Sequence, residues 1–343
     1  MGRKILVMTA KQSSEETLHL GVIGCGQWGP NHIRNFSHLS GSRVLMCSDL
    51  NLKRLQTMKE TFRNIHPTNN YKDILKNPRI NAVAIATPSH THYKIVKESL
   101  LAGKDVLCEK PLCLKSAEAQ ELTHLAAKRK KILMVGHVFL FNEGVRKLRE
   151  LIRNSKLGDL YYLNSVRTNL GPFRTDVNAV WDLATHDIAI FNYLLNASPI
   201  EVSAKGGRYL QKNLEDVAFV SLVYPGGILV HIHVSWLDPR KVRQITAVGT
   251  KKMVIWDDLD QTGPIKIYDR QVIQQHYYET FGEFSLLAKE GDITIPKINS
   301  YEPLKTQDAH FVECLRSRKT PLSDGRTGCA VVRILTAIDR SLS

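Results

Sequence analysis

The sequence lacks the features that would place the protein in a membrane or in an oxidising compartment. None of its apolar runs approaches the roughly 20 residues that a membrane-spanning helix needs. The opening residues, MGRKILVMTAKQSS, hold too short an apolar stretch for a secretion signal, and Leu6 stands where a myristoylation signal requires Ser or Thr. The six cysteines form no Cys-x-x-Cys pair and no alternating Cys/His series, which argues against a disulfide framework and a structural zinc site. We therefore expect a cytoplasmic protein with no membrane partner.

Acidic residues are scarce relative to basic ones. The sequence contains 33 Asp and Glu residues and 47 Lys and Arg residues, which gives a formal net charge of +14. Such a balance favours anionic partners, whether nucleic acid, a membrane surface or a phosphorylated metabolite. No recognition helix, zinc finger or aromatic-basic RNA motif accompanies the charge, so we expect no nucleic-acid partner. The charge alone does not identify the anion, and the motifs must do so.

Short apolar runs alternate with helical patterns in the first part of the chain. The runs LHLGVIG, RVLMCSD, AVAIATP, DVLCEKP and ILMVGH lack polar alternation, as is typical of strands covered by helices on both faces. Helical spacing predicts helices over 52–62, 92–103 and 116–131, the last capped by Ser116. The pattern predicts an α/β fold with a doubly wound parallel sheet, a Rossmann domain over residues 17–137, preceded by a tail over residues 1–16.

After residue 138 the strands become longer and alternate between polar and apolar residues. A chain of 343 residues exceeds the usual size of a single core, so a second domain is expected. Pro225-Gly226-Gly227 predicts a hairpin, after which apolar residues from Ile228 to Trp236 share one face. We predict an α+β domain over residues 138–343 with a large, open, mostly antiparallel sheet, whose C-terminal helices could pack back on the first domain. The open face predicts a homodimer or homotetramer.

A glycine-rich stretch, GCGQWG, follows the first predicted strand and precedes a helix. Such a turn lets the backbone approach a pyrophosphate at the positive end of the helix, although glycines can also serve packing alone. Asp49 ends the second strand, where a carboxylate binds the ribose hydroxyls of NAD; capping of the next helix is the alternative. The predicted cofactor is NAD, and its expected ligands are Gly24, Gly26, Gln27, Trp28, Gly29, Asp49, Thr87, Pro88, His92, Glu109 and Lys110.

Three residues are candidates for catalysis. Lys110 follows the fifth strand, at the edge of the sheet where ligands bind. Asp182 and His186 lie four residues apart, so one helix face would carry both, with Asp182 orienting the imidazole and His186 exchanging a proton with an alcohol. A helix-capping histidine beside a structural aspartate is the alternative. The pairs His90-x-His92 and His231-x-His233 have no further partners in the sequence, so we expect no metal.

Five motifs occur together in an order that resembles a known family. GCGQWG, ATPSHTHY (86–93), CEKP (108–111), VGHVF (135–139) and WDLATHDI (181–188) resemble the glucose–fructose oxidoreductase/inositol dehydrogenase/MocA family in order and spacing. The resemblance implies an NAD-dependent dehydrogenase in which Lys110, Asp182 and His186 serve catalysis. Lys110 and His186 could exchange the roles of base and of hydroxyl-binding group.

Within the family, the chain is similar to the bacterial nucleotide-sugar 3-dehydrogenases. This likeness implies oxidation of the C3 hydroxyl of UDP-N-acetylglucosamine for lipopolysaccharide or another surface polysaccharide, with functional coupling to an aminotransferase. Residues before the candidate helix, Arg167, Asn169 and Arg174, together with His186, are expected substrate ligands, since Arg suits phosphate.

Other functions remain open at this point. Within the enzyme class they are oxidation of inositol or a free sugar, and reduction of a 3-ketosugar with NADPH. Asp49 disfavours NADPH, whereas Lys53 and Arg54 lie near enough in the sequence to accommodate it. A non-catalytic NAD-sensing module is the alternative of a different class.

Overall fold

The five apolar runs of the first domain, with the short polar strand β3 added at one edge, form a parallel sheet of six strands in the order β3-β2-β1-β4-β5-β6. The computed structural model describes residues 17–276, 284–299 and 301–342, so the predicted tail lies outside the described residues. All residues of β4 and β5 are buried because helices cover both faces of the sheet, as predicted. The strands are β1 Leu18–Ile23, β2 Ser42–Ser48, β3 His66–Thr68, β4 Ala82–Ile85, β5 Asp105–Glu109 and β6 Leu133–Gly136.

Helices connect these strands and place the candidate site at one edge of the sheet. They are α1 Gly29–His38, α2 Leu52–Thr61, α3 Tyr71–Lys76, α4 Ser89–Leu101 and α5 Ser116–Lys128. The predicted cap at Ser116 is wrong: Ser116 already belongs to the helix, and the preceding Lys115 makes no capping hydrogen bond through its side chain. The strand order reverses between β1 and β4, so the connections after these two strands diverge and leave a crevice beyond their carboxyl ends.

The second domain is built on a sheet of eight strands in the order β14-β13-β12-β11-β7-β10-β9-β8. Only β7 and β10 run parallel to each other, so the predicted mostly antiparallel sheet is confirmed. The predicted hairpin joins β9 to β10, and Gly226 and Gly227 there adopt φ values of +83° and +77°, which favour glycine. The strands are β7 Leu160–Leu170, β8 Glu201–Gly207, β9 Val217–Tyr224, β10 Ile228–Ser235, β11 Leu237–Gly249, β12 Met253–Asp257, β13 Ile265–His276 and β14 Phe284–Thr294.

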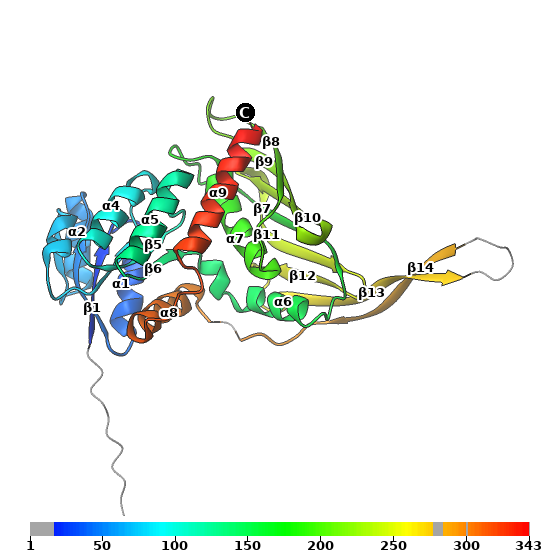
Figure 1. Ribbon diagram of the computed structural model, residues 1–343, viewed down its shortest axis with the longest axis horizontal. Helices are drawn as coiled ribbons and strands as arrows, with labels where there is room; N and C mark the ends of the chain where they lie inside the picture. The colour runs from blue at the N-terminus through cyan, green and yellow to red at the C-terminus, as the bar shows by residue number, and fades with distance from the viewer. Residues whose placement is uncertain (1–16, 277–283, 300, 343) are drawn as a thin grey trace, which may run out of the picture.

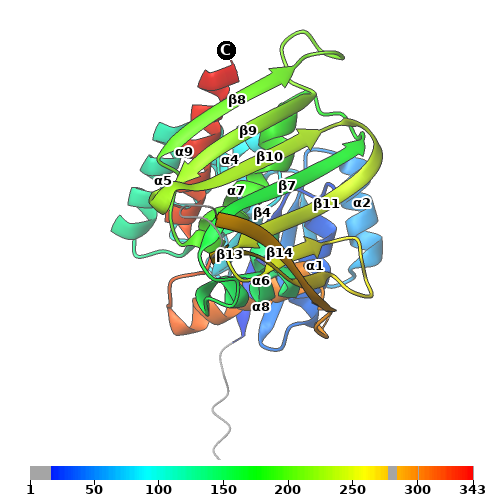
Figure 2. The same cartoon turned by 90° about the vertical axis from the view of Figure 1, so that its right-hand side faces the viewer.

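The two faces of this sheet differ in what covers them. One face carries α6 (Glu143–Arg153), α7 (Thr185–Leu195) and two short helical turns, the 3₁₀ turn Val138–Phe141 and the π-helical turn Val180–Ala184. The predicted apolar face of β10 is buried there, from Val230 to Trp236. Figure 2 shows that no described helix lies over the other face of β8, β9, β10, β7 and β11. Phe219 and Leu229 are about half exposed on that face.

The C-terminal helices join the two domains (Figure 1). Helix α8 (Pro303–Ser317) packs on α1, and α9 (Gly325–Leu342) packs along α5 and then against β8. Just before α9, Ser323 lies beside β6: its carbonyl accepts from the Val135 amide (2.7 Å), and its hydroxyl donates to the Val135 carbonyl (2.7 Å). None of the described helices has both the length and the apolar character to cross a membrane.

A buried charge network ties α8 to the first domain. The ring of His32, on α1, contacts Glu109 at the end of β5 through Nε2 (3.0 Å) and Asp308 of α8 through Nδ1 (2.9 Å). Asn35 donates a further hydrogen bond to Asp308 (3.0 Å). Burial by itself would lower the pKa of His32, but the two carboxylates outweigh it and raise the pKa to about 10. His32 is therefore an imidazolium at neutral pH and holds three elements together.

Replacing His32 tests this network. His32→Leu leaves the buried carboxylates of Glu109 and Asp308 without a counter-charge, so we expect the free energy of unfolding to fall by about 3–5 kcal/mol in urea titrations. Folding raises the pKa of His32 from 6.5 to about 10. The difference in free energy of unfolding between wild type and variant should therefore have its full value below pH 6.5 and decrease as the pH rises through about 10.

Two further variants control this prediction. Asp308→Asn in the His32→Leu background removes one stranded charge and should recover part of the loss. Arg34→Gln breaks an ion pair on the same helix, to Glu302, that is nearly half exposed, so it should cost under about 1 kcal/mol. A His32→Leu effect no larger than that of Arg34→Gln would contradict the assigned role.

Candidate cofactor and catalytic site

The turn between β1 and α1 leaves open space beside one of its glycines. Gly24 has φ +96°, and a Cβ there would lie 2.5 Å from the Ala86 carbonyl oxygen; a Cβ on Gly29 would lie 1.9 Å from the Gly24 carbonyl oxygen. Beside Gly26, by contrast, only the tip of Arg54 comes within 4 Å. Gln27 and Trp28 are exposed at the tip of the turn. Two glycines are thus required by packing, while the third leaves room for a pyrophosphate at the start of α1.

Asp49 follows β2 and is held beside this turn. Its carboxylate accepts hydrogen bonds from the Cys25 amide (2.7 Å) and the Asn51 amide (2.8 Å). The alternative role of helix cap belongs to Asn51, whose side chain accepts from the first amides of α2. Arg54 also approaches Asp49, at 3.6 Å. The carboxylate is therefore fixed where a ribose would follow the pyrophosphate.

The loop after β4 is tied to the loop after β5 by His92. This histidine is 1% exposed, and its two ring nitrogens lie 2.7 Å from the Pro111 carbonyl and 2.8 Å from the Thr87 carbonyl. Thr87 also hydrogen-bonds Thr91 through its hydroxyl (2.7 Å), and Pro88 precedes α4. His92 therefore links the two loops, and its predicted contact with the cofactor stays a prediction. Glu109 is likewise held by His32 in the buried network.

Lys110 meets the second domain at the carboxyl edge of the sheet. Its ammonium donates to the Asp182 carbonyl oxygen (2.7 Å) and lies 3.5 Å from the Asp182 carboxylate. Burial lowers the pKa of Lys110, and Asp182 opposes that shift. The same carboxylate accepts from Arg174 (3.3 Å) and from the indole nitrogen of Trp236 (3.3 Å). Three donors therefore converge on one aspartate.

His186 lies in the first turn of α7 and does not pair with Asp182. The prediction that Asp182 orients its ring is wrong, because residues 180–184 form a π-helical turn, in which residues four apart no longer stack. Its Nδ1 is buried without a hydrogen-bond partner among the described residues, and its ring packs edge-on against Phe139, with centroids 4.9 Å apart. Burial, then Lys110 and Arg167, hold the pKa of His186 well below its usual range. The imidazole is therefore neutral, and the same surroundings weaken it as a base.

The predicted substrate ligands divide into buried and accessible residues. Arg167 is 3% exposed and forms a bidentate pair with Asp187 (2.9 Å for each bond), while its predicted substrate contact stays a prediction. Asn169 donates to the Gly171 carbonyl. Asn169 and Arg174 are both partly exposed, and Arg174, which pairs with Asp176 and Asp182, touches the candidate catalytic group.

Sequence reasoning missed His137, which directly follows β6. It is 2% exposed, and neither ring nitrogen has a hydrogen-bond partner among the described residues. Leaving a buried polar group unsatisfied costs about 1–3 kcal/mol. The sequence could have indicated His137 as a site residue, because the motif VGHVF places it one residue after a predicted strand, at the same edge of the sheet as Lys110.

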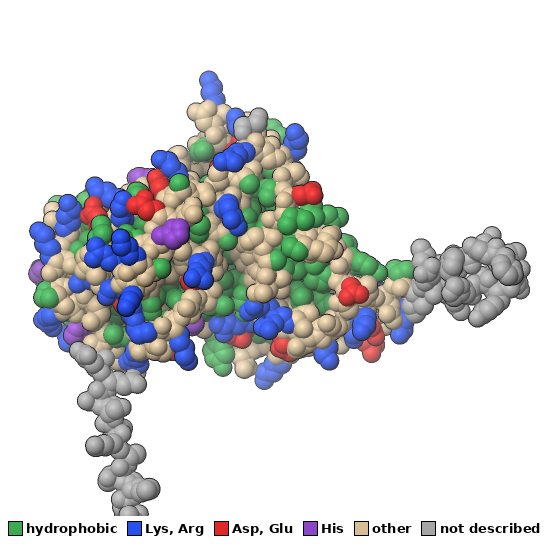
Figure 3. All heavy atoms as spheres, in the orientation of Figure 1, with side chains coloured by type: hydrophobic (Ala, Val, Ile, Leu, Met, Phe, Trp, Pro, Cys, Tyr) green, Lys and Arg blue, Asp and Glu red, His purple; other side chains and the backbone are tan. Residues whose placement is uncertain are grey.

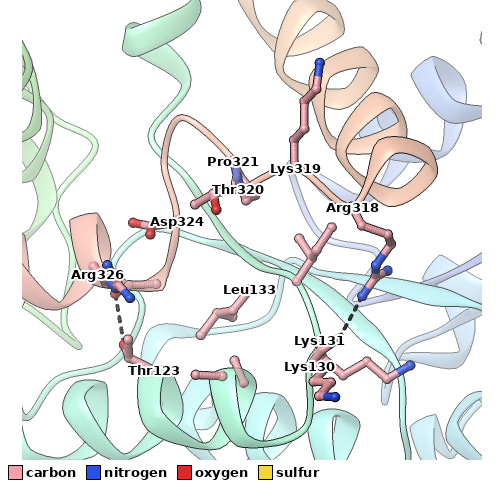
Figure 4. A pocket seen from close by; sticks show the side chains of 14 residues that line it. Thr123, Lys130, Lys131, Leu133, Arg318, Lys319, Thr320, Pro321, Asp324 and Arg326 are labelled. Atoms are coloured by element: carbon pink, nitrogen blue, oxygen red, sulfur yellow. Dashed lines mark hydrogen bonds between the residues drawn. The ribbon is translucent and has the colours of Figure 1, made fainter.

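A basic hollow lies at the opposite edge of the parallel sheet (Figure 4). Its volume is about 410 Å³, and the end of α5, the start of β6 and the loop before α9 line it. Arg318 donates there to Asp105 (2.8 and 3.0 Å), while Lys131 and Lys319 extend away from each other. On the face in Figure 3, basic side chains are spread over the first domain and form no single stripe. Within the described residues, no group of three or more His, Cys, Asp or Glu could hold a metal ion.

Comparisons with known proteins agree with this geometry. Residues 18–137 match the oxidoreductase family with an NAD-binding Rossmann fold, and residues 145–255 match the GFO/IDH/MocA C-terminal domain. Myo-inositol 2-dehydrogenase of Thermotoga maritima is 25% identical over 95% of this chain and 96% of its own length. The uncharacterized oxidoreductase YrbE of Bacillus subtilis is 26% identical over 62% of this chain, and the match spans 65% of YrbE.

Solved structures share the fold at lower identity. UDP-N-acetylglucosamine 3-dehydrogenase GnnA from Acidithiobacillus ferrooxidans superimposes with a TM-score of 0.79 at 22% identity and covers 95% of this chain and 97% of its own. An oxidoreductase from Agrobacterium radiobacter in complex with NAD+ gives a TM-score of 0.79 at 16% identity, covering 95% of this chain and 96% of its own. With two matched domains that span most of its length, this chain belongs to the GFO/IDH/MocA family of NAD-binding oxidoreductases.

Proposed function

We propose that the protein oxidises a ring hydroxyl of a nucleotide sugar, the C3 hydroxyl of UDP-N-acetylglucosamine, to a ketone. The observation that carries this proposal is the meeting of Lys110, from the cofactor domain, with Asp182, from the second domain, beside the crevice. NAD+, when bound, accepts the hydride from the carbon, and the hydroxyl proton goes to the protein. The products are the ketosugar, NADH and one proton.

Two groups of the chain can handle the proton. His186 is neutral, and its Nδ1, which has no hydrogen-bond partner among the described residues, can accept the proton, although burial and the nearby cations lower its pKa. Lys110, whose pKa burial lowers, can hold the reacting oxygen and stabilise its developing negative charge. With Asp182 occupied by Lys110, Arg174 and Trp236, His186 is the better acceptor, and Lys110 is the group that binds the oxygen. The reverse assignment stays open and gives the same overall reaction.

The charge of the protein supports a nucleotide sugar as the substrate. A diphosphate suits a chain with a net charge of +14, and Arg174 offers a guanidinium at the mouth of the site. The fold of GnnA supports the same substrate class. The inositol dehydrogenases among the relatives make inositol the second candidate. Reduction of a 3-ketosugar with NADPH would draw on Arg54 instead, which lies beside Asp49.

A substrate comparison tests the proposed function. The protein is incubated with NAD+ and UDP-N-acetylglucosamine, UDP-N-acetylglucosaminuronic acid or myo-inositol, and NADH absorbance is followed. Because the oxidation is uphill, an aminotransferase and glutamate are added to consume the ketone. We expect the fastest reduction with UDP-N-acetylglucosamine. Faster turnover of myo-inositol would favour the second candidate, and no NADH with any ring hydroxyl would support a non-catalytic NAD-binding module.

Variants in the same assay test the catalytic groups. Lys110→Met and His186→Asn, made separately, should each lower kcat by roughly 10²–10⁴-fold, the usual effect of losing a general acid or base. The Kd of NAD+, measured by fluorescence titration, should stay within about twofold. Lys97→Met, which removes an exposed lysine paired with Glu121, is the matched control and should leave kcat unchanged. Full activity in both site variants would refute the mechanism.

Asp49 is expected to select NAD over NADP. Asp49→Asn removes the charge that repels a 2′-phosphate and weakens one acceptor for the ribose hydroxyls. We expect the Kd of NAD+ to rise roughly tenfold and that of NADP+ to fall, as measured by calorimetric titration. Asp159→Asn, at an exposed residue of the second domain, should change neither constant. An unchanged NAD+/NADP+ ratio in Asp49→Asn would argue for Arg54 as the determinant.

The uncovered face of the second sheet is proposed to pair copies of the chain. The ring of Phe219 stacks on that of His233 there (4.4 Å), beside exposed Leu229, on a face without helices in the described part of the chain. In solution scattering, the wild-type protein should have the mass of a dimer or tetramer. The double variant Phe219→Glu, Leu229→Glu should have a lower mass. Leu52→Glu, at an exposed residue of α2, is the control. A monomeric wild type would contradict the proposal.

A further inference from the structure

His137 differs from the other fully buried histidines of the first domain. His32 and His92 engage both ring nitrogens, with carboxylates or with backbone carbonyls. His137 engages neither nitrogen within the described residues, although it is 2% exposed. An imidazole held in the interior without protein partners requires a bound water or a ligand to supply them, and the position of His137 decides between the two.

Its position relates it directly to Lys110. Glu109 of β5 pairs in register with Gly136 of β6, so Lys110 and His137 are the next residues on adjacent strands. Adjacent strands lie about 4.8 Å apart. The sequence after β6 also places Phe139 two residues on, against the ring of His186. The unpartnered imidazole therefore stands at the same edge as the two groups assigned to the reacting hydroxyl.

The ring is available for hydrogen bonding in its neutral form. Burial lowers the pKa of His137 to about 4, Glu109 opposes that shift, and Lys110 adds to it. A neutral imidazole offers one N–H donor and one acceptor nitrogen, which matches a hydroxyl group. On a six-membered ring, the hydroxyl next to the reacting one lies within hydrogen-bonding distance of it. The backbones of Lys110 and His137 are separated by one interstrand spacing, so their side chains can reach neighbouring groups of one ring.

We propose that His137 binds the hydroxyl adjacent to the one that is oxidised, so that the enzyme requires a vicinal diol on the ring. This inference rests on the proposed function and adds a specificity-determining residue to it. His137 takes no proton from the substrate in this role. By binding the hydroxyl on the adjacent carbon, His137 determines which ring carbon faces the nicotinamide.

The test compares two variants and two substrates. His137→Leu should lower kcat/KM for the best substrate of the comparison above by roughly 10- to 100-fold, mainly through KM, since it removes binding that ground state and transition state share. For wild type, kcat/KM should fall by a similar factor when the substrate is replaced by the analogue that lacks the adjacent hydroxyl. For His137→Leu, the same replacement should lower kcat/KM only a little further. His137→Gln, which restores a donor and an acceptor, should recover part of kcat/KM.

Two measurements separate this role from a structural or cofactor role. The Kd of NAD+ should stay within about twofold in His137→Leu. His310→Gln changes a histidine whose pKa is set by burial, Glu313 and Arg146, and it should leave kcat/KM unchanged. The inference fails, and the proposed function stands, if wild type is active and His137→Leu has the same kcat/KM. It fails in the same way if His137→Leu and wild type discriminate equally against the analogue that lacks the adjacent hydroxyl. A weakened NAD+ Kd with normal KM would overturn it in favour of a nicotinamide contact. No turnover by wild type would overturn both.

Discussion

The protonated ring of His32 is the constraint on which the geometry of the site depends. A buried carboxylate is costly unless a charge compensates it, and His32 compensates two, Glu109 and Asp308. The three residues belong to α1, β5 and α8, so none of these elements can move without stranding a charge. The glycine turn that precedes α1 and the lysine that follows Glu109 are thereby fixed relative to each other, and the crevice between them is preorganised.

Around Lys110 the charges are arranged for a reaction that creates negative charge. Lys110 and Arg174 share Asp182, while His137 and His186 are neutral. Arg174 also pairs with Asp176, so the two cations and the two carboxylates balance. In the proposed reaction the buried ammonium of Lys110 stabilises an oxygen that loses its proton more strongly than it would in water. The burial that removes charge from the imidazoles leaves each with one N–H donor and one acceptor nitrogen, as the proposed contacts with a sugar hydroxyl require.

What the sequence could predict was decided by the range of the interactions involved. Buried parallel strands need continuous apolar runs, and the steric need of Gly29 arises within the turn itself, against the Gly24 carbonyl, so both were readable. The pairing of Asp182 with His186 failed because a π-helical turn changes the period locally. The ion pair of Arg167 was not readable because its partner, Asp187, lies 20 residues away. His137 was missed because no sequence pattern shows that a ring lacks partners.

The hydrogen bond between Ser323 and Val135 spans 188 residues. During synthesis the chain emerges from its N-terminus, so β6 is available long before Ser323 and α8 have been made. Until then the parallel sheet has an open edge beside β6, and Glu109 has only half of its eventual charge network. The cofactor domain is continuous in sequence yet incomplete as a folding unit. Its dinucleotide crevice takes its final form only after the second domain has left the ribosome.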